Sequence, residues 1–289
     1  YASEARKLGY RVGYLEGVAY ALKNMGMGYY TKGDYIAVLE NWQQSLAAFD
    51  SIDDKVGVSN ILNNLGTVYF NQGDDASAID YYLRSLQVAE EIGDELRIAS
   101  ALLNIGNVYL NKTETHDKAL EYLSRGLKLS ESLNEQDAIG NASVNIGEIY
   151  YLQENYDSAL VYFEISLNAF DQEGSGNLPY ALNNIGKVYT ATSEYPTAID
   201  YHQRAYEFSR RIDDKLQMAQ SLIGIGNTRN RQKNYQDALR AFRDAQDLGV
   251  ELGASKELKE VYEGLSAAYA ARGNFNEAFR YQTLLTEVN

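Results

Sequence analysis

One unit of about 40 residues recurs along this chain, and this repeat restricts the possible folds more than any other feature. Seven similar segments carry a small residue at an equivalent place, here called the reference position: Gly26, Gly66, Gly106, Gly147, Gly186, Gly226 and Ser266. Successive reference positions are 40, 40, 41, 39, 40 and 40 residues apart. A fixed period of this length predicts a repeat architecture in which each unit buries its apolar face against its neighbours.

Each unit has the pattern of two helices joined by a turn. Apolar and small residues recur three or four apart, as in Leu62, Leu65 and Tyr69, which is the helical period. Turn residues that tolerate a left-handed conformation follow the reference position and are expected to close the first helix: Gly33-Asp34, Gly73-Asp74, Asn155, Asn234 and Gly273-Asn274. We therefore expect seven helix pairs, preceded by a single helix over about Tyr1 to Val12.

The residues Leu62, Leu65-Gly66, Tyr69, Ala78, Tyr82 and Ser85 resemble the tetratricopeptide repeat, a helix-turn-helix unit usually about 34 residues long. The 40-residue variety is similar to repeats of Pins-type adaptors, kinesin light chains and bacterial tetratricopeptide signalling proteins. This resemblance covers nearly all 289 residues. It implies an all-α fold, a right-handed α-solenoid of about seven helix pairs plus an N-terminal half unit, forming a single domain over residues 1–289.

Composition excludes several classes of function. A net charge of -14 opposes binding to nucleic acid, and the lack of cysteine excludes disulfides, thiolate metal sites and a cysteine nucleophile. No apolar stretch is long enough to span a bilayer, so we expect a soluble segment, with the cytoplasm favoured over the periplasm. The chain begins without Met and in mid-pattern, which suggests an excerpt of a longer protein.

The side chains offer no catalytic constellation, so we expect no enzyme activity, cofactor or metal site. His116 is predicted to be a solvated turn residue, and His202 a packed one at the place of Tyr82 and Phe163. The acidic pairs Asp53-Asp54 and Asp213-Asp214 fall between units, where helix N-termini explain them.

Two other apparent motifs are explained by the repeat. Gly224-Ile225-Gly226 lacks the strand before it and the Lys-Ser/Thr after it that a phosphate loop needs. The tyrosines three residues after the reference position are predicted to be repeat core: Tyr29, Tyr69, Tyr109, Tyr150, Tyr189 and Tyr269.

One series of polar residues in the first helices favours a binding function. Two residues before the reference position stand Asn24, Asn64, Asn104, Asn145 and Asn184, and the series ends with Gly224 and Gly264. Asn is a mediocre helix former, so five in one register need a reason. In the families that this chain resembles, this position lines a concave groove, where asparagines hold a peptide backbone. Hydrogen bonding between neighbouring helices is the alternative.

The charge pattern is compatible with such a groove. Fourteen-residue windows around the reference positions carry a net charge of +2, which leaves -16 for the rest of the chain. Lys23, Lys187 and Arg231 are isolated basic residues in these windows. Aromatic anchors for a partner are expected in the same helices, at Tyr20, Tyr30, Phe70, Tyr151 and Tyr180.

These observations favour a non-enzymatic scaffold that binds a peptide segment of another protein in its concave groove. We expect binding to concentrate in the first five units, which carry the asparagines. The alternative is the sensory or dimerisation region of a bacterial histidine kinase or nucleotide cyclase, since many such proteins carry similar repeats. Uncapped solenoid ends would also allow a homodimer.

Overall fold

The computed structural model describes residues 1–288, and its regular structure there is helical throughout. The chain divides into two compact units, residues 1–138 (unit 1) and residues 139–289 (unit 2). Each consists of helix pairs in which a first helix packs against a second helix, as the sequence predicts. No helix of the described residues is both long and apolar enough to cross a membrane.

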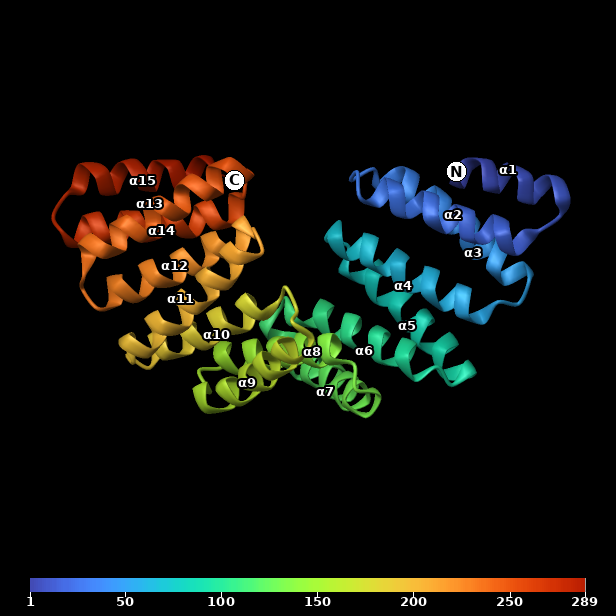
Figure 1. The fold of residues 1–289 in the computed structure, drawn as a ribbon, viewed down its shortest axis with the longest axis horizontal. Helices are drawn as coiled ribbons and strands as arrows, with labels where there is room; N and C mark the ends of the chain where they lie inside the picture. The colour runs from blue at the N-terminus through green and yellow to red at the C-terminus, as the bar shows by residue number, and fades with distance from the viewer. Residues whose placement is uncertain (289) are drawn as a thin grey trace. The chain divides into compact units, whose positions relative to one another are not determined.

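Unit 1 contains a single N-terminal helix followed by three pairs (blue to green in Figure 1). Helix α1 packs against α2, which confirms the predicted half unit. The helices are α1 (Ala2–Val12), α2 (Leu15–Tyr30), α3 (Tyr35–Ser51), α4 (Lys55–Asn71), α5 (Asp75–Ile92), α6 (Glu95–Leu110), the short 3-10 helix η1 (Thr113–Thr115) and α7 (His116–Leu133).

Unit 2 contains the remaining four pairs (green to red in Figure 1). The first helices also contact one another, α10 against α12 and α12 against α14, so they form a continuous layer of their own. The helices are α8 (Gln136–Leu152), which begins three residues before the boundary, α9 (Tyr156–Glu173), α10 (Leu178–Ala191), α11 (Tyr195–Arg211), α12 (Lys215–Arg231), α13 (Tyr235–Leu252), α14 (Ser255–Ala271) and α15 (Phe275–Glu287).

The reference glycine is required because a large side chain of the second helix lies against it. A Cβ atom added at Gly147 would come within 2.6 Å of the Phe163 ring, and one at Gly226 within 2.6 Å of the Phe242 ring. Real Cβ atoms do not approach so closely, so a larger residue would push the two helices apart. The recurring glycine is therefore the contact point in six of the seven pairs, and the last pair carries Ser266 instead.

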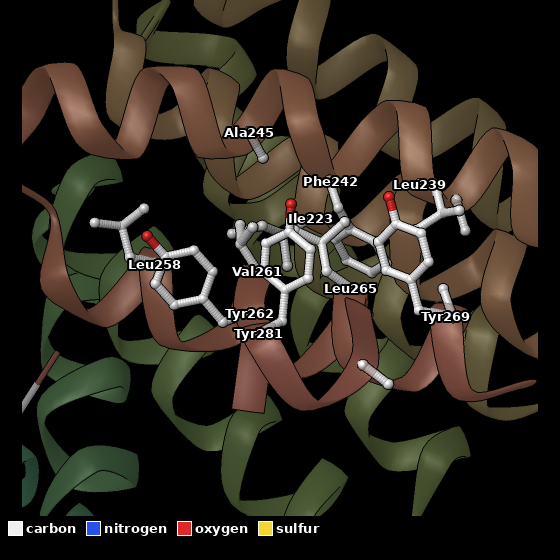
Figure 2. Packing of buried hydrophobic residues seen from close by; sticks show 13 residues of the cluster. Ile223, Leu239, Phe242, Ala245, Leu258, Val261, Tyr262, Leu265, Tyr269 and Tyr281 are labelled. Carbon is white, nitrogen blue, oxygen red and sulfur yellow. The ribbon is translucent and has the colours of Figure 1, made fainter. Parts of the chain in front are cut away.

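Figure 2 shows the resulting core at the end of unit 2. Phe242 of α13 is fully buried among side chains of α12, α14 and α15. The labelled members are Ile223, Leu239, Phe242, Ala245, Leu258, Val261, Tyr262, Leu265, Tyr269 and Tyr281. Leu284, Leu285 and Val288 pack against this cluster, so most of the apolar side chains near the end of α15 are used within the unit.

The tyrosines predicted to be core lie mostly at its edge, and five of the six stack on a tyrosine of the second helix. The Tyr69 and Tyr81 rings are 5.3 Å apart and nearly parallel, and those of Tyr189 and Tyr201 are 5.6 Å apart. Tyr69 and Tyr189 are half-buried, and Tyr269 is buried. Further stacks pair Tyr109 with Tyr122, Tyr150 with Tyr162 and Tyr269 with Tyr281.

The turns within pairs follow the prediction at the glycines but not at the asparagines. Gly33, Gly73 and Gly273 adopt the left-handed conformation, with φ of 73°, 77° and 76°. Asn155 instead begins α9 as its N-cap, and its side chain accepts a hydrogen bond from the backbone N–H of Ser158. The left-handed residue is the one before it, Glu154, with φ of 58°. Asn234 and Lys233 repeat this arrangement, so these asparagines start helices rather than close them.

In each acidic pair between successive helix pairs, one residue caps a helix and the other adopts the left-handed conformation. The Asp54 carboxylate caps α4 and accepts a hydrogen bond of 2.8 Å from the backbone N–H of Gly57. Asp214 caps α12 in the same way. Asp53 and Asp213 hold the left-handed position before each cap, with φ of 56° and 58°. Helix N-termini thus explain one residue of each pair, and the turn explains the other.

The prediction for His116 is wrong. This histidine is only 4% exposed and is the first residue of α7. The turn before it folds as the 3-10 helix η1, whose last residue, Thr115, directly precedes His116. The turn therefore ends before His116, and the imidazole is buried at the start of α7.

Candidate binding cavity

A cavity of about 540 Å³ lies in unit 2, lined mainly by first helices. Residues spaced three or four apart on one face of α10 and one face of α12 make up half of its lining residues, at the same places relative to the reference glycine. They are Tyr180, Asn183, Lys187 and Thr190 on α10, and Gln220, Ile223, Asn227 and Asn230 on α12. Further wall comes from Glu148 and Tyr151 of α8, His202 of α11, Gly224 and Arg231 of α12, and Lys256 and Glu260 of α14.

His202 reaches this cavity from a second helix, at the place that Phe163 and Phe242 fill in neighbouring pairs. The prediction that it is packed is confirmed, because its side chain is 1% exposed. Its ring lies between two glycines of the first helices. A Cβ atom added at Gly186 would come within 2.7 Å of the ring, and one at Gly224 within 2.4 Å. The ring can therefore pass between α10 and α12 to the cavity wall.

A chain of hydrogen bonds fixes which ring nitrogen of His202 carries the proton. The Ser221 hydroxyl donates to the carbonyl oxygen of Gln217, so it accepts from the amide nitrogen Nδ2 of Asn183 at 3.0 Å. Oδ1 of Asn183 then faces Nδ1 of His202 at 2.9 Å. An amide oxygen only accepts, so Nδ1 must donate. In the neutral ring this leaves a lone pair on Nε2.

Burial keeps this imidazole neutral. It lowers the pKa of His202 from 6.5 to about 3, and the positive charge of Lys187 adds to the effect. A charged imidazole would lose its hydration without gaining a carboxylate partner, so the uncharged form is strongly preferred. At neutral pH the cavity wall therefore presents a histidine that accepts a hydrogen bond through Nε2 and carries no charge.

Further polar contacts join the first helices around the cavity. The Thr190 and Thr228 hydroxyls are 2.7 Å apart, which links α10 to α12. Nδ2 of Asn230 donates to the carbonyl oxygen of Gly264 at 3.1 Å, which links α12 to α14. These bonds satisfy much of the polar wall and hold the three helices in register.

Charged residues of both signs surround the opening. Lys187, Arg231 and Lys256 contribute positive charge, and Glu148 and Glu260 negative charge. Lys187 donates from Nζ to Oδ1 of Asn184 at 3.3 Å. The aromatic wall is uncharged, since burial, reinforced by the Glu148 carboxylate, raises the pKa of Tyr180 to about 12.

The asparagines of the predicted series lie in different environments. In unit 1, Asn24 is exposed and Asn64 half-buried, while Asn104 donates to Oδ1 of the Asn63 side chain at 2.9 Å. In unit 2, Asn145 is half-buried and Asn184 is buried. The cavity wall uses Asn183, one position earlier than the series. The peptide-binding role of the series stays a prediction.

The predicted aromatic anchors divide between the two units. Tyr151 and Tyr180 line the cavity of unit 2. In unit 1, Tyr20 is 43% exposed and meets the Phe49 ring edge-on, and Tyr30 stacks on Trp42 and accepts a hydrogen bond from Asn71. Phe70 is half-buried against the core of its own unit.

Sequence reasoning missed the polar cavity residues Asn183, Asn230 and Gln220. A usable signal was present, because Asn183 shares one face of α10 with the predicted Tyr180, and Gln220 and Asn230 lie at the equivalent places on α12. Lys187 and Arg231, which are isolated in the sequence, line the same cavity. Among the described residues, no group of three or more histidine or acidic side chains is placed to hold a metal ion.

The fold and the repeated helix pairs define a class of helical repeat protein, and comparison with known proteins identifies the family. The family model described as tetratricopeptide repeat matches residues 17–91, 97–172 and 177–249. Since these segments make up most of the chain, it belongs to the tetratricopeptide repeat family. No curated protein sequence matches the chain.

Solved structures with a similar fold include two Rap proteins and an aspartyl phosphate phosphatase. RapI in its apo form is 17% identical, with a TM-score of 0.74 over 93% of this chain and 97% of its own. Aspartyl phosphate phosphatase F from Bacillus subtilis is 15% identical, with a TM-score of 0.77 over 99% and 72%. A Rap protein complexed with competence and sporulation factor is 16% identical, with a TM-score of 0.69 over 95% and 74%. At these identities the likeness shows the fold alone.

Proposed function

We propose that this chain is a non-enzymatic scaffold that binds a peptide segment of another protein along its first helices, with the cavity of unit 2 as the principal site. The observation that carries this proposal is the cavity itself. Its wall combines two tyrosines, Tyr151 and Tyr180, with hydrogen-bonding groups from α10 and α12. Binding sites typically combine an apolar surface with a few placed polar groups in this way.

The comparisons support the same class of function. Tetratricopeptide repeats expose extended surfaces that other chains can occupy, and one structural neighbour was solved in complex with a competence and sporulation factor. The mixed charges around this cavity would suit a peptide more than a strongly charged polymer, since Lys187 and Arg231 lie near Glu148 and Glu260.

A substitution that fills the cavity of unit 2 tests whether the peptide binds there. Asn227 is exposed and lies on the cavity face, so Asn227→Trp would fill the cavity without entering the core. Gln203 is exposed on the second helix α11, and Gln203→Trp serves as the matched control. Immobilised protein would be used to select binders from a random twelve-residue peptide library, and their affinities measured by calorimetry.

We expect saturable peptide binding that is weakened at least about tenfold by Asn227→Trp and unchanged by Gln203→Trp, because a tenfold loss needs only about 1.4 kcal/mol. Failure to recover any saturable binder would contradict the proposed function. Equal affinity of the Asn227→Trp variant and the native chain would place the site elsewhere.

The asparagine series needs a separate test in unit 1. Each hydrogen bond to a peptide is worth about 0.5 to 1.5 kcal/mol net, so Asn64→Ala with Asn104→Ala should weaken a peptide bound there by about 1 to 3 kcal/mol. Asn63→Ala is the control, because it removes the bond that Asn104 makes to α4 but keeps both asparagines of the series. If the double variant binds like the native chain, the series has no part in binding.

A further inference from the structure

The inner wall of the unit 2 cavity presents two hydrogen-bond acceptors that the protein itself leaves unused. Nδ2 of Asn230 is held by the Gly264 carbonyl, so the amide orientation is fixed and Oδ1 points away from that bond. Oδ1 is buried and accepts no hydrogen bond from the described residues. The second acceptor is Nε2 of His202, because Nδ1 carries the proton and is occupied by Asn183.

A buried acceptor without a partner is costly, and Oδ1 of Asn230 is such an atom in the cavity that His202 also lines. Leaving a buried polar atom without a partner costs about 1 to 3 kcal/mol, so each such atom in a folded protein calls for an explanation. The two neighbouring pairs of unit 2 avoid this cost at the position of His202 by using Phe163 and Phe242, which have no polar side-chain atoms. The polar substitution occurs in the pair whose ring reaches the cavity wall.

The surrounding groups indicate what kind of ligand would satisfy these acceptors. A carboxylate only accepts hydrogen bonds, so it would oppose both Nε2 of His202 and Oδ1 of Asn230. An ammonium or guanidinium group would donate, but it would meet a net positive charge, because the basic residues Lys187, Arg231 and Lys256 outnumber the acidic residues Glu148 and Glu260. A carboxamide donates from its nitrogen and accepts through its oxygen, so it matches both the inner acceptors and the basic side chains at the opening.

We propose that His202 and Asn230 are specificity-determining residues, and that the cavity selects a partner peptide through the carboxamide side chain of Gln or Asn. This inference rests on the proposed function, since it names the chemistry that the peptide site recognises. A site built to hydrogen-bond a donor rejects an analogue that lacks the donor, because its own buried groups are then left unpaired.

The first test uses small probes, so that it does not depend on finding a peptide. Propionamide has the head group of Gln, and propionate has that of Glu. The protein would be labelled with ¹⁵N-histidine, which gives signals from only two residues, His116 and His202. His116 belongs to unit 1 and is the internal control.

Millimolar propionamide should shift the Nε2 resonance of His202 saturably, and propionate should do so at least about tenfold more weakly. His116 should not respond to either probe. No response of His202 to propionamide, or an equal response to both probes, would overturn the proposal.

The second test uses a variant whose residues come from the neighbouring pair. Asn183→Val with His202→Phe installs the combination Val144 and Phe163 of α8 and α9, so the helices should still pack. Unchanged circular dichroism would establish that this variant is folded. For a library peptide that contains Gln, the native chain should prefer Gln over Glu by at least about tenfold, and the variant by less than about threefold.

The two proposals fail in different ways. Peptides that bind without any preference for Gln, together with an unresponsive His202, would refute the selection of carboxamides but keep the peptide-binding function. A His202 response to propionamide without any peptide binder would refute the peptide-binding function but keep the recognition of carboxamides.

Discussion

Burial of the His202 imidazole should make the stability of unit 2 depend on pH. The pKa of this side chain is lowered from 6.5 to about 3, first by burial and then by the charge of Lys187. A base with a lowered pKa binds fewer protons in the folded state than in the unfolded state between these two values. Its contribution to stability is therefore complete above about pH 6.5 and is lost as the pH falls toward 3.

The size of the effect follows from the two pKa values. At pH 5 the unfolded chain is mostly protonated at this site and the folded chain is not. The free energy of unfolding is therefore about 2 kcal/mol lower at pH 5 than at pH 7.5. Acidic residues titrate in the same range, and their contribution must be removed. The variant with Asn183→Val and His202→Phe keeps all of them, so the difference between the native chain and this variant isolates His202.

Hydrogen exchange of the α11 amides is the suitable assay. Repeat arrays open locally, so a single free energy of unfolding for the whole chain is poorly defined. The only tryptophan, Trp42, lies in unit 1 and would report on the wrong part. After correction for intrinsic exchange rates, opening of α11 in the native chain should become about 30-fold more favourable between pH 7.5 and pH 5, beyond any change in the variant.

Two results would refute this reasoning. One is a pH dependence of α11 exchange that is the same in both proteins. The other is an NMR titration of His202 with a midpoint near 6.5, which would mean that water reaches the ring freely and that the cavity wall does not hold a neutral acceptor.

Two matched pairs of substitutions test the packing and the turns. Gly224→Ala places a Cβ atom 2.4 Å from the His202 ring and should destabilise unit 2 by about 1 to 3 kcal/mol. Gly28→Ala, with nothing within 4 Å, should be neutral or stabilise its surroundings by up to about 1 kcal/mol. Equal changes in amide hydrogen exchange, at α12 for Gly224→Ala and at α2 for Gly28→Ala, would contradict the packing argument. Asp54→Ala removes the α4 cap and should cost about 1 kcal/mol. Asp53→Gly should instead slow amide exchange at the start of α4, because Asp53 holds a left-handed φ of 56°, and faster exchange would show that its side chain has another role.

The sequence predicts the fold well because the signals that define it are local and repeated seven times. Glycine and turn residues mark each helix end, and the period sets which residues meet, as with Gly147 and Phe163. The errors arise where one position can serve two tasks. Asn155 is suited both to a left-handed turn and to an N-cap, and the cap leaves the left-handed position to Glu154, a residue that does not mark such turns.

The site is less predictable because a pattern assigns a residue to a helix more securely than to one face of it. Adjacent positions on a helix differ by about 100° in direction. Asn183 lines the cavity, while Asn184, one position later, is buried and bonded by Lys187. Both asparagines are equally visible in the sequence. Only the packing of α10 against its neighbours decides which of them reaches the cavity.

The end of the asparagine series has a cause in packing that bears on where a partner binds. At Gly224 a side chain would collide with the His202 ring, and at Gly264 with the Phe242 ring, whose atoms lie 2.2 Å from a Cβ atom placed there. Glycine is thus required at both positions for the second helices to pack. Asn227 and Lys256, which belong to these last two pairs, still line the cavity. The end of the series therefore gives no reason to confine binding to the first five units. Asn227→Trp tests a helix pair in which the asparagine series predicts no binding.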